Sequence, residues 1–243
     1  MLALAAVGAG ALILLVASVA SRRPVATVGD RAAYLATWST LHGLDAGRTL
    51  VVRRWLSAVY RLARPLARAG VAPGLLTTWG LFAGALTLAL ADLGGRWALV
   101  AAAAAVLSGV LDGVDGAVAV LTQRATRLGF VLDSVTDRVV DGLYLAALWR
   151  LGAPPGACVV AGAAIGLLEY TRARAGAAGM REISVVTVAE RPTRVIITVA
   201  AFGAAGMYAG RSAEVAGLGA WATLAVSLLG LGQLLVVVRR RLR

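Results

Sequence analysis

Five of the chain's twelve acidic residues lie in one segment, LDGVDGAVAVLTQRATRLGFVLDSVTDRVVD, residues 111–141. Residues three or four apart share a face of a helix. Asp112 and Asp115 therefore form one carboxylate ridge, and Asp133, Asp137 and Asp141 form another. The chain has a single histidine and a single cysteine. Carboxylates must therefore carry any acid–base or metal chemistry.

The connection between the two ridges, TQRATR, is short and polar. It predicts an antiparallel helical hairpin in which all the carboxylates meet near one point. A carboxylate inside a membrane costs about 2.5–3.5 kcal/mol, and several together repel one another unless a cation neutralises them. Oxygen-only ligands select hard ions such as Mg²⁺, Mn²⁺ or Ca²⁺. Four carboxylates would hold two such ions, as in phosphoryl-type transfer.

Small residues accompany the aspartates at fixed spacings. Gly113 and Gly116, with Ala119 and Gly129, leave room for a ligand's phosphates or base to approach the backbone closely. The alternative is close helix packing through small residues, which is common in membranes. The fixed spacing relative to the aspartates favours the ligand.

The composition predicts the elements that must position these residues. The chain is 60% hydrophobic, with a mean hydropathy of +0.82. These values indicate an all-α integral membrane protein. Apolar runs long enough to cross a bilayer occur at 2–20, 74–93, 97–121, 128–149, 156–171, 193–210 and 214–238. We expect a six-helix transmembrane bundle preceded by an additional N-terminal span, for which a retained anchor is favoured over a cleaved signal peptide.

Arginine placement predicts the orientation. The net charge is +12, and every basic residue is an arginine. Such an excess in a membrane protein indicates cytoplasmic loops and lipid contact rather than nucleic-acid binding. One side of the membrane would hold only Arg96, Arg150 and Arg211. The aspartates then face the cytoplasm from the cell membrane. The segment 47–70 alternates apolar and arginine positions and predicts an amphipathic interfacial helix, although a surface linker helix is the alternative.

The pattern Asp112-x-x-Asp115-Gly116-x-x-Ala119, followed by Gly129-x-x-x-Asp133-x-x-x-Asp137, resembles the signature of the CDP-alcohol phosphotransferases. The resemblance covers residues 47–243 and leaves 1–46 as an N-terminal anchor and linker. It implies a membrane enzyme that moves a phosphatidyl-type group from a CDP-linked lipid donor, such as CDP-diacylglycerol, to an acceptor hydroxyl and releases CMP. The implied cofactor is a pair of Mg²⁺ or Mn²⁺ ions.

The resemblance also implies roles for single residues. Metal binding falls to Asp112, Asp115, Asp133 and Asp137, with Asp137 also acting as the general base. The CDP pocket would be lined by Gly116, Ala119 and Gly129.

One position departs from the signature, which has arginine where this chain has Val120. We expect Arg124, one helical turn later on the same face, to substitute for it in part at the CDP site. Asp141 continues the ridge beyond the signature and, with Arg138 nearby, is expected to be structural.

An arginine-rich segment follows at 169–194. Guanidinium groups bind phosphate in a bidentate manner, so a small anionic acceptor would be held by Arg172, Arg174, Arg191 and Arg194, with Arg181 in the same cluster. The alternatives are ordinary positive-inside topology and ion pairs with Glu169, Glu182 or Glu190. The run RARA followed by ERPTR resembles actinobacterial phosphatidylinositol-phosphate synthases, which implies inositol phosphate as acceptor. A phosphatidylglycerophosphate synthase, with glycerol phosphate as acceptor, is the nearest alternative.

Two other classes of function stay open. A catalytically weakened, lipid-binding membrane scaffold would account for Val120 and the additional first span. A cation transporter would account for intramembrane carboxylates but not for the glycine spacing. Relatives in the resembled family are often dimers, and the small-residue spans would permit a homodimer.

Overall fold

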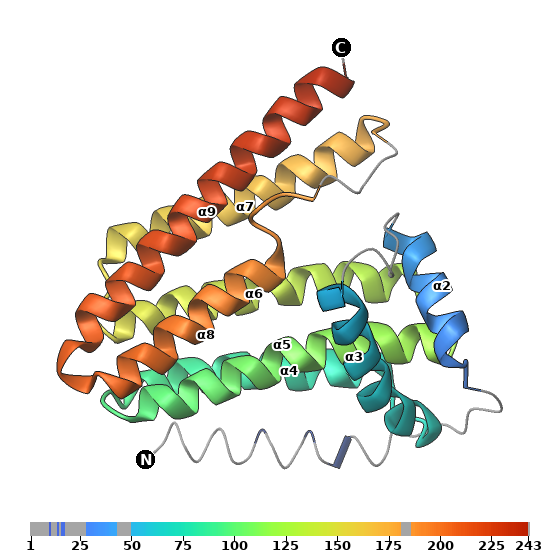
Figure 1. The fold of residues 1–243 in the computed structure, drawn as a ribbon, viewed down its shortest axis with the longest axis horizontal. Helices are drawn as coiled ribbons and strands as arrows, with labels where there is room; N and C mark the ends of the chain where they lie inside the picture. Colours follow the sequence, from blue (N-terminus) through green and yellow to red (C-terminus); the bar gives the residue numbers. More distant parts are fainter. Residues whose placement is uncertain are drawn as a thin grey trace. The chain divides into compact units, whose positions relative to one another are not determined.

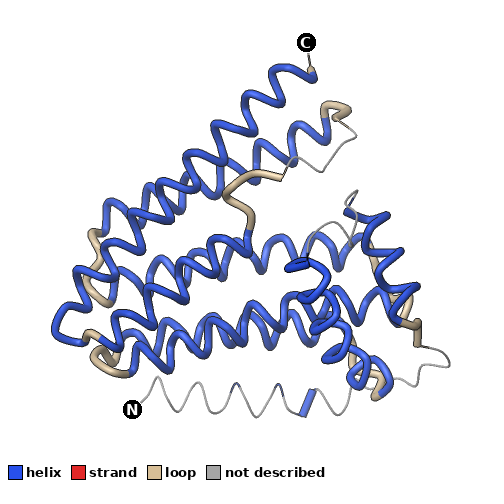
Figure 2. Tube along the Cα trace, viewed as in Figure 1, coloured by secondary structure: helices blue, strands red, loops and turns tan. Residues whose placement is uncertain are grey.

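The computed structural model describes residues 10, 14, 16, 17, 28–42, 50–180 and 186–242, without the side chains of residues 41, 42 and 51. Throughout these residues the regular structure is helical (Figure 2). Most of the predicted first span, 2–20, lies outside the described residues. Arg181 also lies outside them. The chain divides into two compact units, unit 1 (Met1–Phe82 and Leu107–Asp137) and unit 2 (Ala83–Val106 and Arg138–Arg243).

The described helices include one for each predicted apolar run from 74–93 onward. They are α2 (Arg31–His42), α3 (Leu50–Arg68), α4 (Pro73–Asp92), α5 (Trp97–Leu121), α6 (Arg127–Arg150), α7 (Pro155–Ala177), α8 (Arg191–Met207), the 3₁₀ turn η1 (Ala209–Arg211) and α9 (Ser212–Arg241) (Figure 1). Prolines stand at the starts of α4, α7 and α8, where a missing N–H costs nothing. The prediction of an all-helical chain is confirmed for the described residues.

Among the described residues, three helical segments are long and apolar enough to cross a membrane, namely Pro73–Asp92, Trp97–Leu121 and Ala209–Arg241. The other three expected spans are helices, but they differ from these in charge or length. In α6 the middle turns carry Asp133, Asp137 and Arg138, and α8 has only 17 residues. The protein is therefore a multi-pass membrane protein with at least three candidate spans among the described helices.

In unit 1, α3 is strongly amphipathic. Its buried side chains, Leu56, Val59, Tyr60, Ala63 and Ala67, recur at helical spacing, while Arg53, Arg61, Arg64 and Arg68 are exposed. The buried face packs with Val114, Ala117 and Val118 of α5 in one apolar cluster. A Cβ on Gly113 of α5 would lie 3.3 Å from the ring of Trp55 and 3.4 Å from Val59. Gly113 therefore permits α3 to cross α5 closely, directly beside Asp112.

Helix α2 packs against α3 in the same unit. The rings of Tyr34 and Tyr60 are 5.8 Å apart, and Arg31 donates a hydrogen bond of 2.7 Å to the hydroxyl of Ser57. The backbone N–H of Gly29 donates to the carbonyl of Leu121 at the end of α5. Residues 28–42 thus contact both α3 and the end of α5.

In unit 2, α9 runs beside α7 and α8 (Figure 1). Glycines permit these close approaches. A Cβ on Gly219 or Gly230 would lie 2.5 Å from Cβ of Ala201 or 2.3 Å from Cβ of Ala189, respectively. A Cβ on Gly206 of α8 would lie 2.6 Å from the backbone nitrogen of Leu99. Small residues therefore set the spacing of the helices in unit 2, as is common in membrane bundles.

We predict that Gly206→Val destabilises the protein by about 1–3 kcal/mol, because the backbone of Leu99 cannot move aside as a flexible side chain can. Thermal unfolding in detergent measures the effect. Gly203→Val is the matched control, since it makes the same change on the same helix at a position with nothing within 4 Å. Equal stability of the two variants would contradict the close approach.

Candidate metal and transfer site

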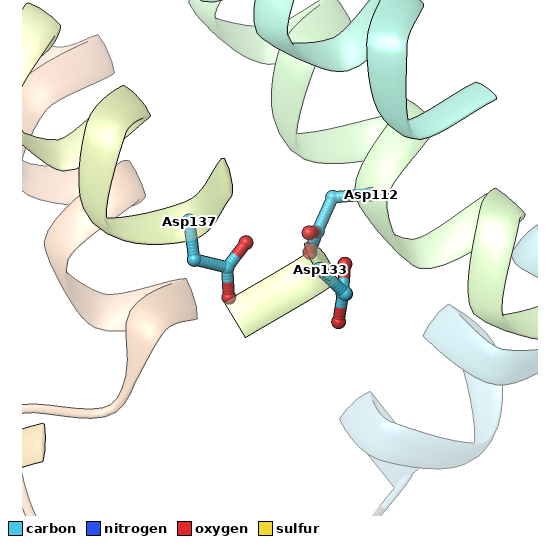
Figure 3. Close-up of side chains that lie close together, drawn as sticks. All are labelled: Asp112, Asp133 and Asp137. Carbon is cyan, nitrogen blue, oxygen red and sulfur yellow. The ribbon is translucent and has the colours of Figure 1, made fainter. Parts of the chain in front are cut away.

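Three predicted metal ligands meet in unit 1. Asp112 of α5 and Asp133 and Asp137 of α6 each offer a carboxylate oxygen, and these oxygens all lie within 4.8 Å of one another (Figure 3). All three residues are partly buried, and Oδ1 of Asp133 and Oδ1 of Asp137 are shielded from solvent. The convergence predicted from the hairpin is confirmed for these three.

The turn between α5 and α6 produces this convergence. The N–H of Arg124 donates to the carbonyl of Ala119, and Gln123 takes a left-handed backbone conformation with φ of 55°. This arrangement ends a helix and reverses the chain. Thr126 then accepts a hydrogen bond of 2.9 Å from the N–H of Gly129, which caps the start of α6.

This turn corrects one expectation. We expected Arg124 to lie one helical turn beyond Val120 on the same face of α5. The helix ends at Leu121, so that placement is wrong. Arg124 lies in the turn itself and is half-buried there. Its contact with CDP stays a prediction that no longer rests on helical spacing.

Asp115, the fourth predicted ligand, is placed differently from the other three. Its side chain is buried, with 4% exposed, and accepts a hydrogen bond of 2.5 Å from the hydroxyl of Thr77 on α4. The charges of Asp112 and Asp133 are close enough to act on it. Asp115 therefore lies near Asp112 and Asp133 and is oriented by Thr77, which the sequence pattern did not indicate.

The small residues divide into packing and open positions. Gly116 is exposed, and a Cβ there would meet nothing within 4 Å, whereas Gly113 is covered by α3. Ala119 is half-buried, and Gly129 is exposed with Thr126 beside it. The face of α5 at Gly116 is thus open to a ligand next to Asp112.

The donor set fits a divalent cation. Three carboxylates supply oxygen ligands only, which is the preference of Mg²⁺, Mn²⁺ and Ca²⁺. A bound cation would also offset the repulsion among the charges of Asp112, Asp133 and Asp137.

The predicted acceptor arginines lie in unit 2, where two of them pair with carboxylates. Arg172 binds Glu190 through two hydrogen bonds, of 2.8 and 3.3 Å. Arg194 is buried, with 2% exposed, and its Nη2 lies 3.2 Å from Oδ2 of Asp141. Arg174 is exposed, and Arg191 is half-buried at the first position of α8.

Two carboxylates of this region have structural roles. Asp141 contacts Arg138 at 3.4 Å as well as Arg194, so its expected role as a structural partner is supported. Glu190 also accepts hydrogen bonds from the N–H and the hydroxyl of Thr187, each 2.9 Å. Burial alone would raise the pKa of Glu190, but the bonds from Arg172 and Thr187 outweigh it and hold the pKa below its usual value.

We predict that Asp133→Asn weakens Mn²⁺ binding at least about tenfold, because it removes a charged oxygen ligand from the cluster. Electron paramagnetic resonance of free Mn²⁺ measures the affinity. Asp92→Asn serves as the control, because Asp92 pairs with Arg150 on the surface at the other end of α4. If both variants bind Mn²⁺ as the parent does, the three carboxylates are not a metal site.

The chain is similar to known proteins both in sequence and in fold. The family model described as CDP-alcohol phosphatidyltransferase matches residues 70–232. A phosphatidylinositol phosphate synthase of Mycolicibacterium smegmatis is 35% identical over 158 residues, which cover 59% of this chain and 68% of the relative. The crystal structure of the Mycobacterium tuberculosis phosphatidylinositol phosphate synthase with CDP-DAG bound is similar, with a TM-score of 0.60 and 26% identity over 74% of this chain and 92% of that one.

The complex of the same Mycobacterium tuberculosis synthase with manganese and citrate is similar at a TM-score of 0.61 and 26% identity, covering 74% of this chain and 88% of that chain. The family match extends over well more than half of the sequence and contains all four signature aspartates. The chain belongs to the CDP-alcohol phosphatidyltransferase family.

Proposed function

We propose that this protein transfers the phosphatidyl group of CDP-diacylglycerol to a hydroxyl of inositol phosphate and releases CMP. The observation that carries the proposal is the convergence of Asp112, Asp133 and Asp137 within 4.8 Å, in a chain of this family. Relatives named phosphatidylinositol phosphate synthase, and a similar structure with CDP-DAG bound, support the choice of donor and acceptor.

In this reaction Asp137 would act as the general base. Its carboxylate would accept the proton of the acceptor hydroxyl. The oxygen then forms a bond to the phosphorus that carries the diacylglycerol, and the bond between that phosphorus and the bridging oxygen of CMP breaks. Asp112, Asp115 and Asp133, with Asp137, would hold divalent ions. Those ions would supply positive charge to the pyrophosphate oxygens.

The donor would lie along the open face of α5. Gly116 allows phosphates to approach the backbone, and Ala119 and Gly129 would complete the pocket. Arg124, in the turn after α5, would supply a cation near the nucleotide. Gly116 is exposed, and a Cβ added there would meet no atom of another segment within 4 Å, which supports this pocket.

The acceptor's phosphate would be bound by Arg172, Arg174, Arg191 and Arg194. Glycerol phosphate is the alternative acceptor, since it offers the same phosphate and a hydroxyl to the same base. A catalytically weakened lipid-binding scaffold is the alternative outside enzymology, and it is motivated by Val120 in place of the signature arginine.

The membrane setting completes the proposal. Helices α4 to α9 would form six spans, and α3 would lie in the interface with its arginines toward anionic headgroups. Arg96, Arg150 and Arg211 are the few arginines at the α4–α5, α6–α7 and α8–α9 connections, and most of the other arginines stand at the remaining connections and the two ends of the chain, which favours a site facing the cytoplasm. The proposal also includes an N-terminal anchor and linker, 1–46, a catalytic region, 47–243, and a homodimeric state.

We expect the reconstituted protein, given CDP-diacylglycerol and Mn²⁺, to release CMP when inositol phosphate is added. In the Asp137→Asn variant the rate of CMP release should fall by about 10²–10⁴-fold, because the general base is lost. Chromatography of CMP measures the rate, and reactions with inositol, glycerol phosphate or no acceptor are run beside it. CMP with glycerol phosphate alone would reassign the acceptor. An absence of acceptor-dependent CMP would favour the scaffold.

We also expect Val120→Arg to raise the affinity for CDP-diacylglycerol about tenfold, because a charge-assisted hydrogen bond to phosphate contributes about 1.5–3 kcal/mol. The readout is KM for the donor. Val120→Gln controls for side-chain length without charge. A KM that is equal in both variants would show that the arginine position of the signature is dispensable in this chain.

A further inference from the structure

We propose that Glu169 is an internal anion that occupies the place of the acceptor's phosphate among three arginines and must be displaced when the acceptor binds. Glu169 thereby sets the affinity for a phosphorylated acceptor. This inference rests on the proposed function and extends it to a specificity-determining residue. Every residue involved lies in unit 2.

Glu169 of α7 receives guanidinium groups from three helices. Its Oε1 lies 2.7 Å from Nη1 of Arg138 on α6 and 3.5 Å from Nη2 of Arg194 on α8. Its Oε2 lies 3.8 Å from Nη1 of Arg172, one turn later on α7. A carboxylate with three guanidinium neighbours has the surroundings that a phosphate group requires.

The charges of this cluster cancel. Arg138, Arg172 and Arg194 supply three positive charges, and Asp141, Glu169 and Glu190 supply three negative ones. A cluster without net charge offers little attraction to an incoming phosphate dianion. A phosphate that binds here must therefore take guanidinium contacts away from one of the carboxylates.

Of the three carboxylates, Glu169 is held least firmly. Asp141 is 5% exposed and pairs with Arg194, which is 2% exposed, so neither can leave without stranding a buried charge. Glu190 is fastened by Thr187 as well as by Arg172. Glu169 is 26% exposed, and two of its three ion-pair distances are 3.5 Å or longer.

An incoming phosphate can reach Arg138 and Arg172, because their side chains are 27% and 24% exposed. Both would keep a carboxylate partner after Glu169 moved away, since Arg138 contacts Asp141 and Arg172 contacts Glu190. The phosphate would thus replace Glu169 without dismantling the rest of the cluster. The cost of removing Glu169 then lowers the affinity for any anionic acceptor.

The test compares wild type with Glu169→Gln in the CMP-release assay. We expect KM for inositol phosphate to fall about fivefold, with kcat and KM for CDP-diacylglycerol within about twofold of wild type, because only the competing charge is removed. Glu214→Gln, at the exposed start of α9, is the matched control. If Glu169 only held the arginines in place, Glu169→Gln would instead raise KM for inositol phosphate.

A second readout needs no turnover. Inorganic phosphate is titrated into the metal-free protein, and its dissociation constant is obtained from the rise in Tm. We expect Glu169→Gln to bind phosphate about fivefold more tightly than wild type, and Glu169→Asp, whose shorter carboxylate reaches fewer arginines, to lie between them. Equal phosphate affinity in wild type and Glu169→Gln, or a Glu169→Gln protein that does not fold while Glu169→Asp matches wild type, would overturn the proposal.

The two hypotheses fail separately. An absence of CMP release by wild type with every acceptor would refute the proposed function, while the phosphate titration would still show whether Glu169 competes for the arginines. Normal CMP release with an unchanged or raised KM in Glu169→Gln would refute the role of Glu169 alone.

Discussion

Mutual repulsion of carboxylates within an apolar helical protein is the constraint on which the rest of the site depends. The oxygens of Asp112, Asp133 and Asp137 lie within 4.8 Å of one another, a distance at which like charges repel strongly outside bulk water. A divalent cation removes that cost and, because it binds the folded arrangement, stabilises it. The turn at Gln123 brings α6 back against α5, so the backbone geometry of a few residues decides whether these carboxylates meet.

A second group of charges, in unit 2, solves the same problem without a metal. There, the buried residues Asp141 and Arg194 lie 3.2 Å apart, and Arg138 and Arg172 each have a carboxylate within 3.5 Å. Breaking such a pair by removing one partner costs about 3–5 kcal/mol, because the other charge stays buried. The number of arginines in this region therefore overstates the positive charge offered to a substrate. Arg194 in particular contributes to the packing of α6 against α8 through Asp141.

The sequence predicted the parts of the structure that depend on local pattern. Apolar runs marked α4 to α9 to within a few residues, except that α7 continues to Ala177 because its RARA segment is also a good helix former. The spacing of Asp112, Asp133 and Asp137 predicted their convergence. Contacts between distant segments were not predictable, since the bond from Thr77 to Asp115 requires knowing which face of α4 meets α5. The run 97–121 ends where α5 ends, and the expectation for Arg124 was wrong because it continued the helical face past that end, into a turn where Gln123 adopts the left-handed conformation.

Glycine illustrates why the sequence pattern alone left the donor pocket ambiguous. Gly113 and Gly116 are one turn apart on α5, and both fit either helix packing or ligand approach. In the structure Gly113 lies against Trp55 and Val59 of α3, while Gly116 faces open space. Gly113 thus fixes the amphipathic helix against the aspartate helix, and the open side of Gly116 lies next to that crossing. The placement of α3 is therefore part of the site's architecture.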